Sequence, residues 1–289
     1  MNVISGISSK PSVKELEAMA HALRCDVVRL VASTGQGYVQ QGLGAADLFA
    51  VLYGHELRFH KDDAAWPERD RFILSTAHNS AVFGAALAQA GLISREMLDT
   101  YCKDGSPYEI NMSERLGPVV EATCGSLGQG LSIAVGMALS GKRAQASYRC
   151  YVMLGDGELQ EGQVWEAIMS AAHYQLGNLC MLIDWNEMQV EGNTSSVMHM
   201  DPISDKLEAF NWQVLDINGH DTSAILGALD SARHTSDRPT AIIARTLVGK
   251  GVPSLEGIFG HNLKLPADMA DRALKELEHS KPVMDGATS

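Results

Sequence analysis

Short apolar segments alternate with amphipathic segments along most of this chain. Five short runs rich in apolar residues, each bounded by polar residues or glycine, predict strands at residues 71–75, 149–154, 179–184, 212–216 and 240–245. Apolar positions spaced three and four residues apart predict helices at residues 13–32, 45–57, 78–91, 128–142, 161–175, 222–234 and 266–279. A glycine-rich segment, residues 34–44, precedes the second of these helices.

The predicted strands are apolar on both faces, which indicates a sheet covered by helices on both sides. Strands separated by helices pair in parallel through right-handed crossovers. The chain is therefore predicted to have an α/β fold with a doubly wound parallel sheet. We expect one domain over residues 1–289, with loosely held ends at 1–10 and 280–289.

Composition excludes some classes of function. The chain has 289 residues and 45% hydrophobic content, enough for a substantial core. Its net charge of −12 argues against a nucleic-acid binder, which needs a basic face. The five cysteines are scattered without a C-x-x-C pair, which indicates reduced thiols. No signal peptide or membrane-spanning run is evident, so we expect a cytoplasmic protein.

A carboxylate flanked by glycines follows the second predicted strand. In residues 152–162 (VMLGDGELQEG), Asp156 stands between Gly155 and Gly157. Ligands of parallel α/β sheets bind outside the carboxyl ends of the strands. Glycines let a bulky anion approach the backbone, and the following helix offers unpaired N–H groups. A carboxylate beside a phosphate needs a cation between them, so the segment indicates Mg²⁺ with a di- or triphosphate.

A second candidate ligand, Asn186, follows the next predicted strand. A strand–helix–strand unit needs about 30 residues, so Asp156 and Asn186 should reach the same edge of the sheet. Mg²⁺ prefers oxygen ligands such as these. Because Asp-Gly is also common in ordinary turns, the pairing with Asn186 is what favours a metal site.

Residues 155–167 (GDGELQEGQVWEA) and 184–189 (DWNEMQ) resemble the thiamine diphosphate signature of transketolases. The resemblance covers about residues 20–262, and its further segments are 45–53, 70–75 with His78, 120–131, and 248–252 with His261. It implies the family's N-terminal domain, which grips the cofactor's diphosphate. It also implies thiamine diphosphate and Mg²⁺, or Ca²⁺ or Mn²⁺, as cofactors, and sugar phosphates as substrates.

The resemblance implies roles for individual residues. The side chains of Asp156 and Asn186 and the carbonyl of Met188 would bind the metal. The implied cofactor-binding residues are Gly125, Leu127, Gly155, Asp156, Gly157, Glu158, Asn186, His78 and His261. His78 and His261 would also contact substrate, and with Glu161, which resembles a glutamate reaching across a dimer interface, they are the implied catalytic residues. Taken singly, His78 and His261 could be ordinary loop residues, and Glu161 a first-turn glutamate favoured by the helix dipole.

Two positions depart from the family's pattern. Tyr38, in residues 36–40 (QGYVQ), stands where most transketolases have a substrate histidine, and Asn111 replaces another. Tyrosine offers one hydroxyl on an apolar ring, and asparagine cannot shuttle protons near neutral pH. We therefore expect a non-standard donor or acceptor: a modified ketose phosphate, a sulfonated or branched sugar, or a deoxyketose that transfers an acetyl unit.

In transketolases, the glutamate that activates the cofactor lies in the next domain, which binds the pyrimidine. This sequence shows no such domain after residue 262. We therefore expect the N-terminal subunit of a split transketolase, with a second subunit carrying the pyrimidine-binding and C-terminal domains in an α₂β₂ assembly. Two alternatives stay open. One is an acyl- or acetyl-transferring thiamine enzyme subunit, similar to deoxyxylulose-phosphate synthase or an α-ketoacid dehydrogenase; the other is a cofactor-binding partner without turnover.

Overall fold

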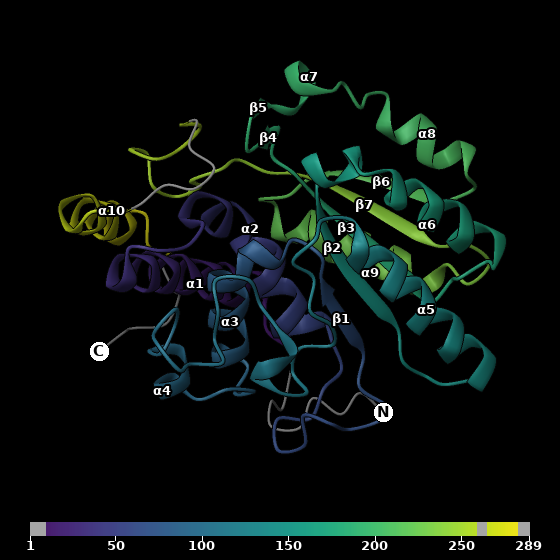
Figure 1. Ribbon diagram of the computed structural model, residues 1–289, viewed down its shortest axis with the longest axis horizontal. Helices are drawn as coiled ribbons and strands as arrows, with labels where there is room; N and C mark the ends of the chain where they lie inside the picture. The colour runs from purple at the N-terminus through teal and green to yellow at the C-terminus, as the bar shows by residue number, and fades with distance from the viewer. Residues whose placement is uncertain (1–9, 259–264, 283–289) are drawn as a thin grey trace.

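Alternate side chains of the strands fill two separate cores, one on each face of a parallel sheet (Figure 1). In β2 (Cys150–Gly155), Tyr151 and Met153 belong to one core, whereas Val152 and Leu154 belong to the other. Successive strand residues point to opposite faces, so a strand buried on both sides must be apolar throughout. The computed structural model describes residues 10–258 and 265–282, and most of the ends that we expected to be loose lie outside this range.

The sheet has five parallel strands in the order β1-β2-β3-β7-β6. The other four are β1 (Arg71–Leu74), β3 (Leu179–Trp185), β6 (Gln213–Asn218) and β7 (Thr240–Arg245). All five strands predicted from the sequence are present. The predicted doubly wound parallel sheet is therefore confirmed.

Helices cover both faces of the sheet (Figure 1). One core receives α1 (Val13–Thr34), α2 (Val39–Val51), α3 (Ser80–Gln89) and α9 (Thr222–His234). The other receives α5 (Gln129–Ala144), α6 (Gly162–His173) and α8 (Ile203–Ala209). α10 (Ala267–His279) packs against α1. Among the described residues, no helix is both long and apolar enough to span a membrane.

Shorter elements connect these layers. They are a π-helix (Leu52–Glu56), 3₁₀ turns η2 (Ala77–Asn79), η3 (Glu114–Leu116) and η4 (Gly157–Gln160), helices α4 (Arg95–Leu98) and α7 (Thr194–Val197), and a hairpin of β4 (Met188–Gln189) and β5 (Gly192–Asn193). The sequence did not predict the hairpin, α4, α7 or α8. The five cysteines are free thiols.

The glycine-rich segment before residue 45 differs from the prediction, because it is helical from Val39 onward. A β-carbon on Gly42 would lie 3.0 Å from Val27 of α1, and one on Gly44 would lie 2.9 Å from the carbonyl oxygen of Leu247. These glycines therefore let α2 pack closely against its neighbours. They do not mark a loop.

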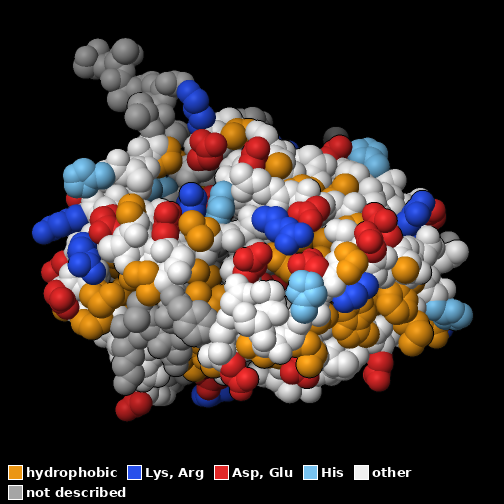
Figure 2. All heavy atoms as spheres, turned by 90° about the horizontal axis from the view of Figure 1, so that it is seen from above, with side chains coloured by type: hydrophobic (Ala, Val, Ile, Leu, Met, Phe, Trp, Pro, Cys, Tyr) orange, Lys and Arg blue, Asp and Glu red, His pale blue; other side chains and the backbone are white. Residues whose placement is uncertain are grey.

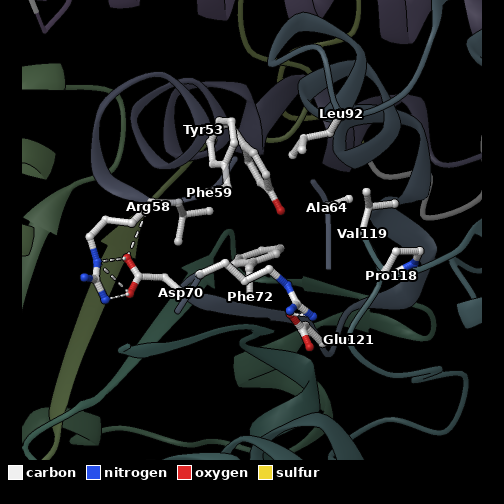
Figure 3. A pocket seen from close by; sticks show the side chains of 12 residues that line it. Tyr53, Arg58, Phe59, Ala64, Asp70, Phe72, Leu92, Pro118, Val119 and Glu121 are labelled. Atoms are coloured by element: carbon white, nitrogen blue, oxygen red, sulfur yellow. Dashed lines mark hydrogen bonds and ion pairs between the residues drawn. The ribbon is translucent and has the colours of Figure 1, made fainter. Parts of the chain in front are cut away.

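A small hollow lies near the amino end of β1, away from the strand ends that carry the predicted site (Figure 3). Asp70 accepts hydrogen bonds from the backbone of Arg58 at 2.9 Å and from its guanidinium at 3.0 Å. Arg69 pairs with Glu121 at 2.9 Å. The hollow encloses about 30 Å³, room for only a few water molecules, so we assign it a structural role only.

Asp47 of α2 lies in a buried polar cluster that joins three segments of the chain. It forms an ion pair with Arg24, and His220 Nδ1 lies 2.7 Å from its Oδ2. The Leu247 N–H donates to His220 Nε2 at 2.8 Å, so Nδ1 carries the proton donated to Asp47. Burial raises the pKa of Asp47, but the His220 hydrogen bond and the Arg24 charge outweigh it and hold the pKa below its ordinary value.

Replacing Asp47 by asparagine is expected to destabilise the chain by about 3 kcal/mol at pH 7, because Arg24 would stay buried without its counter-charge. A depressed pKa gives stability that is present above the carboxyl's ordinary pKa and is lost as pH falls through the folded-state value. Urea unfolding from pH 7 to pH 3 should therefore show the two proteins converging at acidic pH. A difference that stays constant across this range would contradict the assignment, and Asp205→Asn, at an exposed site, is the matched control.

Candidate active site

A cavity of about 350 Å³ opens where β1, β2 and β3 end. Its walls come from the turn after β1, from residues 155–161 after β2, and from residues 184–191 after β3, with Gln41, Leu127 and Val197 completing the lining. This is the edge at which parallel α/β sheets bind ligands, and the volume is typical of a ligand pocket. Asp156 and Asn186, which the sequence predicted at this edge, both line the cavity.

Asp156 lies at the base of this cavity and is 1% exposed. Its Oδ1 accepts a hydrogen bond from the Gly157 N–H at 2.8 Å, and its Oδ2 accepts one from the Glu187 N–H at 2.5 Å. Burial, with a further contribution from the Asp184 carboxylate, raises the pKa of Asp156 to about 7. The protein thus holds a carboxylate in a place where a cation would stabilise its charged form.

Asn186 and Met188, the other two predicted metal ligands, line the same cavity. Asn186 donates from Nδ2 to Asp184 at 3.2 Å, and its Oδ1 accepts from the Met188 N–H at 3.0 Å. Between them, Glu187 adopts a left-handed conformation with φ of +60°, which is costly for a residue other than glycine. This turn presents the Glu187 N–H to Asp156, so it brings the ends of β2 and β3 together.

The charge of the cavity favours a divalent cation. Its described lining includes five carboxylates but no lysine or arginine; the five are Asp156, Glu158, Glu161, Asp184 and Glu191. A diphosphate would be repelled unless a cation lay between it and these groups. Among the described residues, no cluster of three His, Cys, Asp or Glu side chains could hold a metal ion alone. An ion here would need amide, carbonyl and phosphate oxygens as well, and such a set suits Mg²⁺.

Gly157 allows the end of β2 to approach the β4 strand closely. A β-carbon at this position would lie 2.7 Å from the β-carbon of Gln189, nearer than such atoms approach in proteins. The contact cannot be relieved by rotating a side chain, because both atoms are fixed to the backbone. The absence of a side chain at Gly157 therefore sets the shape of the cavity wall.

The variant Gly157→Ala is expected to displace the β4 strand and to weaken binding of the predicted ligand, Mg²⁺–thiamine diphosphate, by about 10- to 100-fold, as changes beside metal ligands commonly do. Titration calorimetry of the purified protein measures the affinity. Gly136→Ala is the matched control, because nothing lies within 4 Å of a β-carbon there. Equal affinities for the two variants would refute this account of Gly157.

Glu158, a predicted cofactor-binding residue, lies in the cavity wall and is 2% exposed. Its Oε1 accepts hydrogen bonds from the Ser75 hydroxyl and from the Gly128 N–H, the latter at 2.6 Å. Its Oε2 accepts one from the Gly155 N–H at 3.2 Å. Burial raises the pKa of this carboxyl. Glu158 thus fastens three segments of the wall together, and direct contact with a cofactor stays a prediction.

Other predicted residues are distributed around the cavity. His78, Leu127 and Glu161 line it, and Glu161 stands at the N-cap position of α6 without a side-chain hydrogen bond to the helix. Tyr38 packs against His78, with ring centroids 4.8 Å apart. Gly125, two residues before Leu127 in the chain, is exposed and is not part of the lining.

Two predicted substrate residues are not placed in the cavity. Asn111 is exposed and lines a separate hollow with Gln36, although its neighbour Met112 donates to the Ala77 carbonyl at 3.1 Å. His261 lies outside the described residues. The roles of both residues stay predictions.

Sequence reasoning missed several polar residues of the cavity. Asp184 is 2% exposed and accepts hydrogen bonds from Thr246 and Asn186, so it orients a predicted metal ligand. The sequence did contain a signal, because burying an aspartate at the end of an apolar strand is costly unless the carboxylate has polar partners. Thr76 and Asn79, directly after β1, were missed in the same way.

The sequence matches a known protein family over most of its length. Residues 15–277 match the family described as "Transketolase, thiamine diphosphate binding domain". The chain is 43% identical to a putative uncharacterized transketolase family protein of Sinorhizobium fredii, over 83% of this chain and 87% of that protein. It is 37% identical to the 6-deoxy-6-sulfo-D-fructose transketolase subunit SqwG of a Clostridium species, over 91% and 96% of the two chains.

A solved structure shares the fold. Transketolase from Leishmania mexicana superimposes with a TM-score of 0.85 at 26% identity. The match covers 93% of this chain but only 42% of that transketolase. The chain therefore spans less than half the length of this solved relative.

Proposed function

This chain belongs to the transketolase family, and from that premise we propose that it is the N-terminal subunit of a two-subunit transketolase. The enzyme would transfer a two-carbon ketol unit from a ketose donor to an aldose acceptor. The chain matches 96% of a relative that is itself named a transketolase subunit, which supports a division of the enzyme into two polypeptides.

The observation that carries this proposal is the acidic cavity at three strand ends, in which a buried Asp156 lacks a cationic side chain. Asp156, Asn186 and the Met188 carbonyl would hold Mg²⁺, and the turn at Gly155 and Gly157 would receive the diphosphate of thiamine diphosphate. When bound, thiamine diphosphate supplies the electron sink for breaking and forming the C–C bond. The residues of this chain position that group, and the walls fixed by Glu158 and Asp184 keep its site rigid.

Exposed apolar residues at the rim of the cavity support the proposal that a second subunit binds there. Leu127, Val190 and Val197 line the cavity and are exposed, and the neighbouring Met198 is 57% exposed. The β4–β5 hairpin and α7, which carry this rim, lie at the top of Figure 1, and Figure 2 views the molecule from that side and shows apolar patches among dispersed charges. We propose that a partner bearing the pyrimidine-binding and C-terminal domains covers this rim in an α₂β₂ assembly.

We further propose that the sugar is a modified ketose and that the reaction takes place in the cytoplasm. Tyr38 packs on His78 where most transketolases have a histidine, so the polar groups offered to a sugar differ. One relative is named for a sulfonated sugar, 6-deoxy-6-sulfo-D-fructose. A sulfonated or otherwise altered donor fits both observations.

The test is a transfer assay on the complex of this chain with its partner subunit. Ketose donors and aldehyde acceptors are incubated with the complex, and the products are identified by mass. Transfer of two carbons that requires both thiamine diphosphate and Mg²⁺ is the expected result. Transfer of an acetyl unit, or no transfer from any ketose, would overturn the proposal.

A further inference from the structure

The turn after β1 carries two buried polar atoms without partners. Thr76 and Asn79 are each 2% exposed, and both line the cavity. Among the described residues, neither Thr76 Oγ1 nor Asn79 Oδ1 has a hydrogen-bond partner. Buried polar atoms are almost always paired, because an unpaired one forfeits the hydrogen bond that it made to water.

The geometry of the turn places these two residues together. η2 is a 3₁₀ turn in which the Asn79 N–H donates to the Thr76 carbonyl at 2.8 Å. Residues three apart in a 3₁₀ turn lie on the same side of it. Thr76 and Asn79 both line the cavity, as does His78, which lies between them in the chain.

The chemistry of these two side chains selects the ligand. An amide oxygen only accepts, so it needs a group that donates a hydrogen bond, whereas a threonine hydroxyl both donates and accepts. The oxygens of a diphosphate carry no hydrogen and cannot satisfy Asn79 Oδ1. A sugar hydroxyl can accept from Thr76 and donate to Asn79 at the same time.

We propose that Thr76 and Asn79 form a subsite that binds a hydroxyl group of the ketose substrate and so determine specificity. The inference rests on the proposed function and adds the part of the sugar, a hydroxyl group, that this wall recognises. It assigns a role to residues that lie outside the predicted metal and diphosphate contacts. A site built to hydrogen-bond a substrate hydroxyl discriminates strongly against analogues that lack it, because its own polar groups are then left unpaired.

The variants Thr76→Val and Asn79→Leu retain the size of each side chain and remove the polar atom. In the free chain, each should raise the melting temperature by about 2–4 °C, because an unpaired buried polar atom is replaced by an apolar one. Binding of Mg²⁺–thiamine diphosphate, measured by calorimetry, should change less than about threefold. A lowered melting temperature, or loss of cofactor affinity, would overturn the subsite.

The decisive measurement is kcat/KM of the two-subunit complex with fructose 6-phosphate, with 6-deoxy-6-sulfo-D-fructose, and with the 4-deoxy and 5-deoxy analogues of each; the 3-hydroxyl is left in place because it becomes the carbonyl of the released aldose. Wild type should prefer a hydroxylated ketose over one of its deoxy analogues by about 100-fold or more, and Asn79→Leu should reduce that preference to about tenfold or less. Variants that retain the preference overturn this inference alone, since wild-type turnover still supports the proposed function. A wild-type complex that transfers two carbons from no ketose overturns both.

Discussion

Replacing Asp156 by alanine is expected to weaken binding of Mg²⁺–thiamine diphosphate by more than about 100-fold. Loss of groups that only orient a metal ligand typically costs 10- to 100-fold, and loss of a ligand should cost more. The cavity has no lysine or arginine in its described lining to take over, and four other carboxylates would remain facing the diphosphate. The cation would therefore lose its main ligand, and the repulsion between these carboxylates and the diphosphate would remain.

A second substitution at this position, Asp156→Asn, separates a binding defect from a folding defect. Burial raises the pKa of Asp156 to about 7, far above the ordinary value of 3.8 that applies to the unfolded chain. The charged carboxylate therefore opposes folding above about pH 7, and this penalty disappears as pH falls toward 4. At pH 8 the cofactor-free variant Asp156→Asn should accordingly be at least as stable as wild type. Thermal unfolding of the two proteins at pH 8 and pH 5 measures this.

Calorimetry of the assembled complex tests the binding prediction. The double variant Asp156→Ala with Asn186→Ala should give no measurable heat of cofactor binding, whereas Asp205→Ala, an exposed aspartate on α8, should bind as wild type does. Identical heats for the double variant and wild type would show that Asp156 and Asn186 do not bind the metal. Unfolding of Asp156→Asn at a lower temperature than wild type at pH 8 would show that the carboxylate is structural instead.

The parts of the fold that the sequence predicted are those with a strong local pattern. Strands such as β2 and β3 are apolar on both faces, and such runs alternating with helices are typical of a buried parallel sheet. Asp156 and Asn186 were identifiable because polar residues at two successive strand ends must meet at one edge. The start of α2 was misjudged because Gly42 and Gly44 serve packing against residues far along the chain, which local propensity does not report.

Some parts of the site depend on tertiary structure that the sequence does not show. Glu158 was predicted to bind the cofactor, but its hydrogen bonds to Ser75, Gly128 and Gly155 are visible only in the structure. Asn79 attracts notice only when its burial and its unpaired oxygen are known together. Asn111 was predicted to contact the substrate from a resemblance in a loop, and this role stays a prediction. The structure puts it in a neighbouring hollow.

Ketol transfer is expected to require the second polypeptide, with the purified chain alone at least about 100-fold less active than the complex. The cavity opens to solvent along a rim where Val190 is 67% exposed and Leu127 is 36% exposed. An uncovered site admits water, which weakens electrostatic stabilisation and lets reactive intermediates be lost. Covering the rim also removes apolar surface from water, which drives the two chains together. Activity titrated against added partner should rise and saturate as the complex seen by sedimentation forms.

A charged side chain on the rim should prevent the partner subunit from binding and so reduce activity. Val190→Asp places a carboxylate where the partner is proposed to pack, so the complex should dissociate and activity should fall with it, while the chain alone stays folded. Tyr174→Asp is the matched control, because Tyr174 is also exposed, at 42%, but follows the far end of α6 and does not line the cavity. A complex of Val190→Asp that sediments and reacts as wild type does would remove the rim from the interface. Full turnover by this chain without any partner would refute the two-subunit enzyme altogether, because the residues around Asp156 would then suffice.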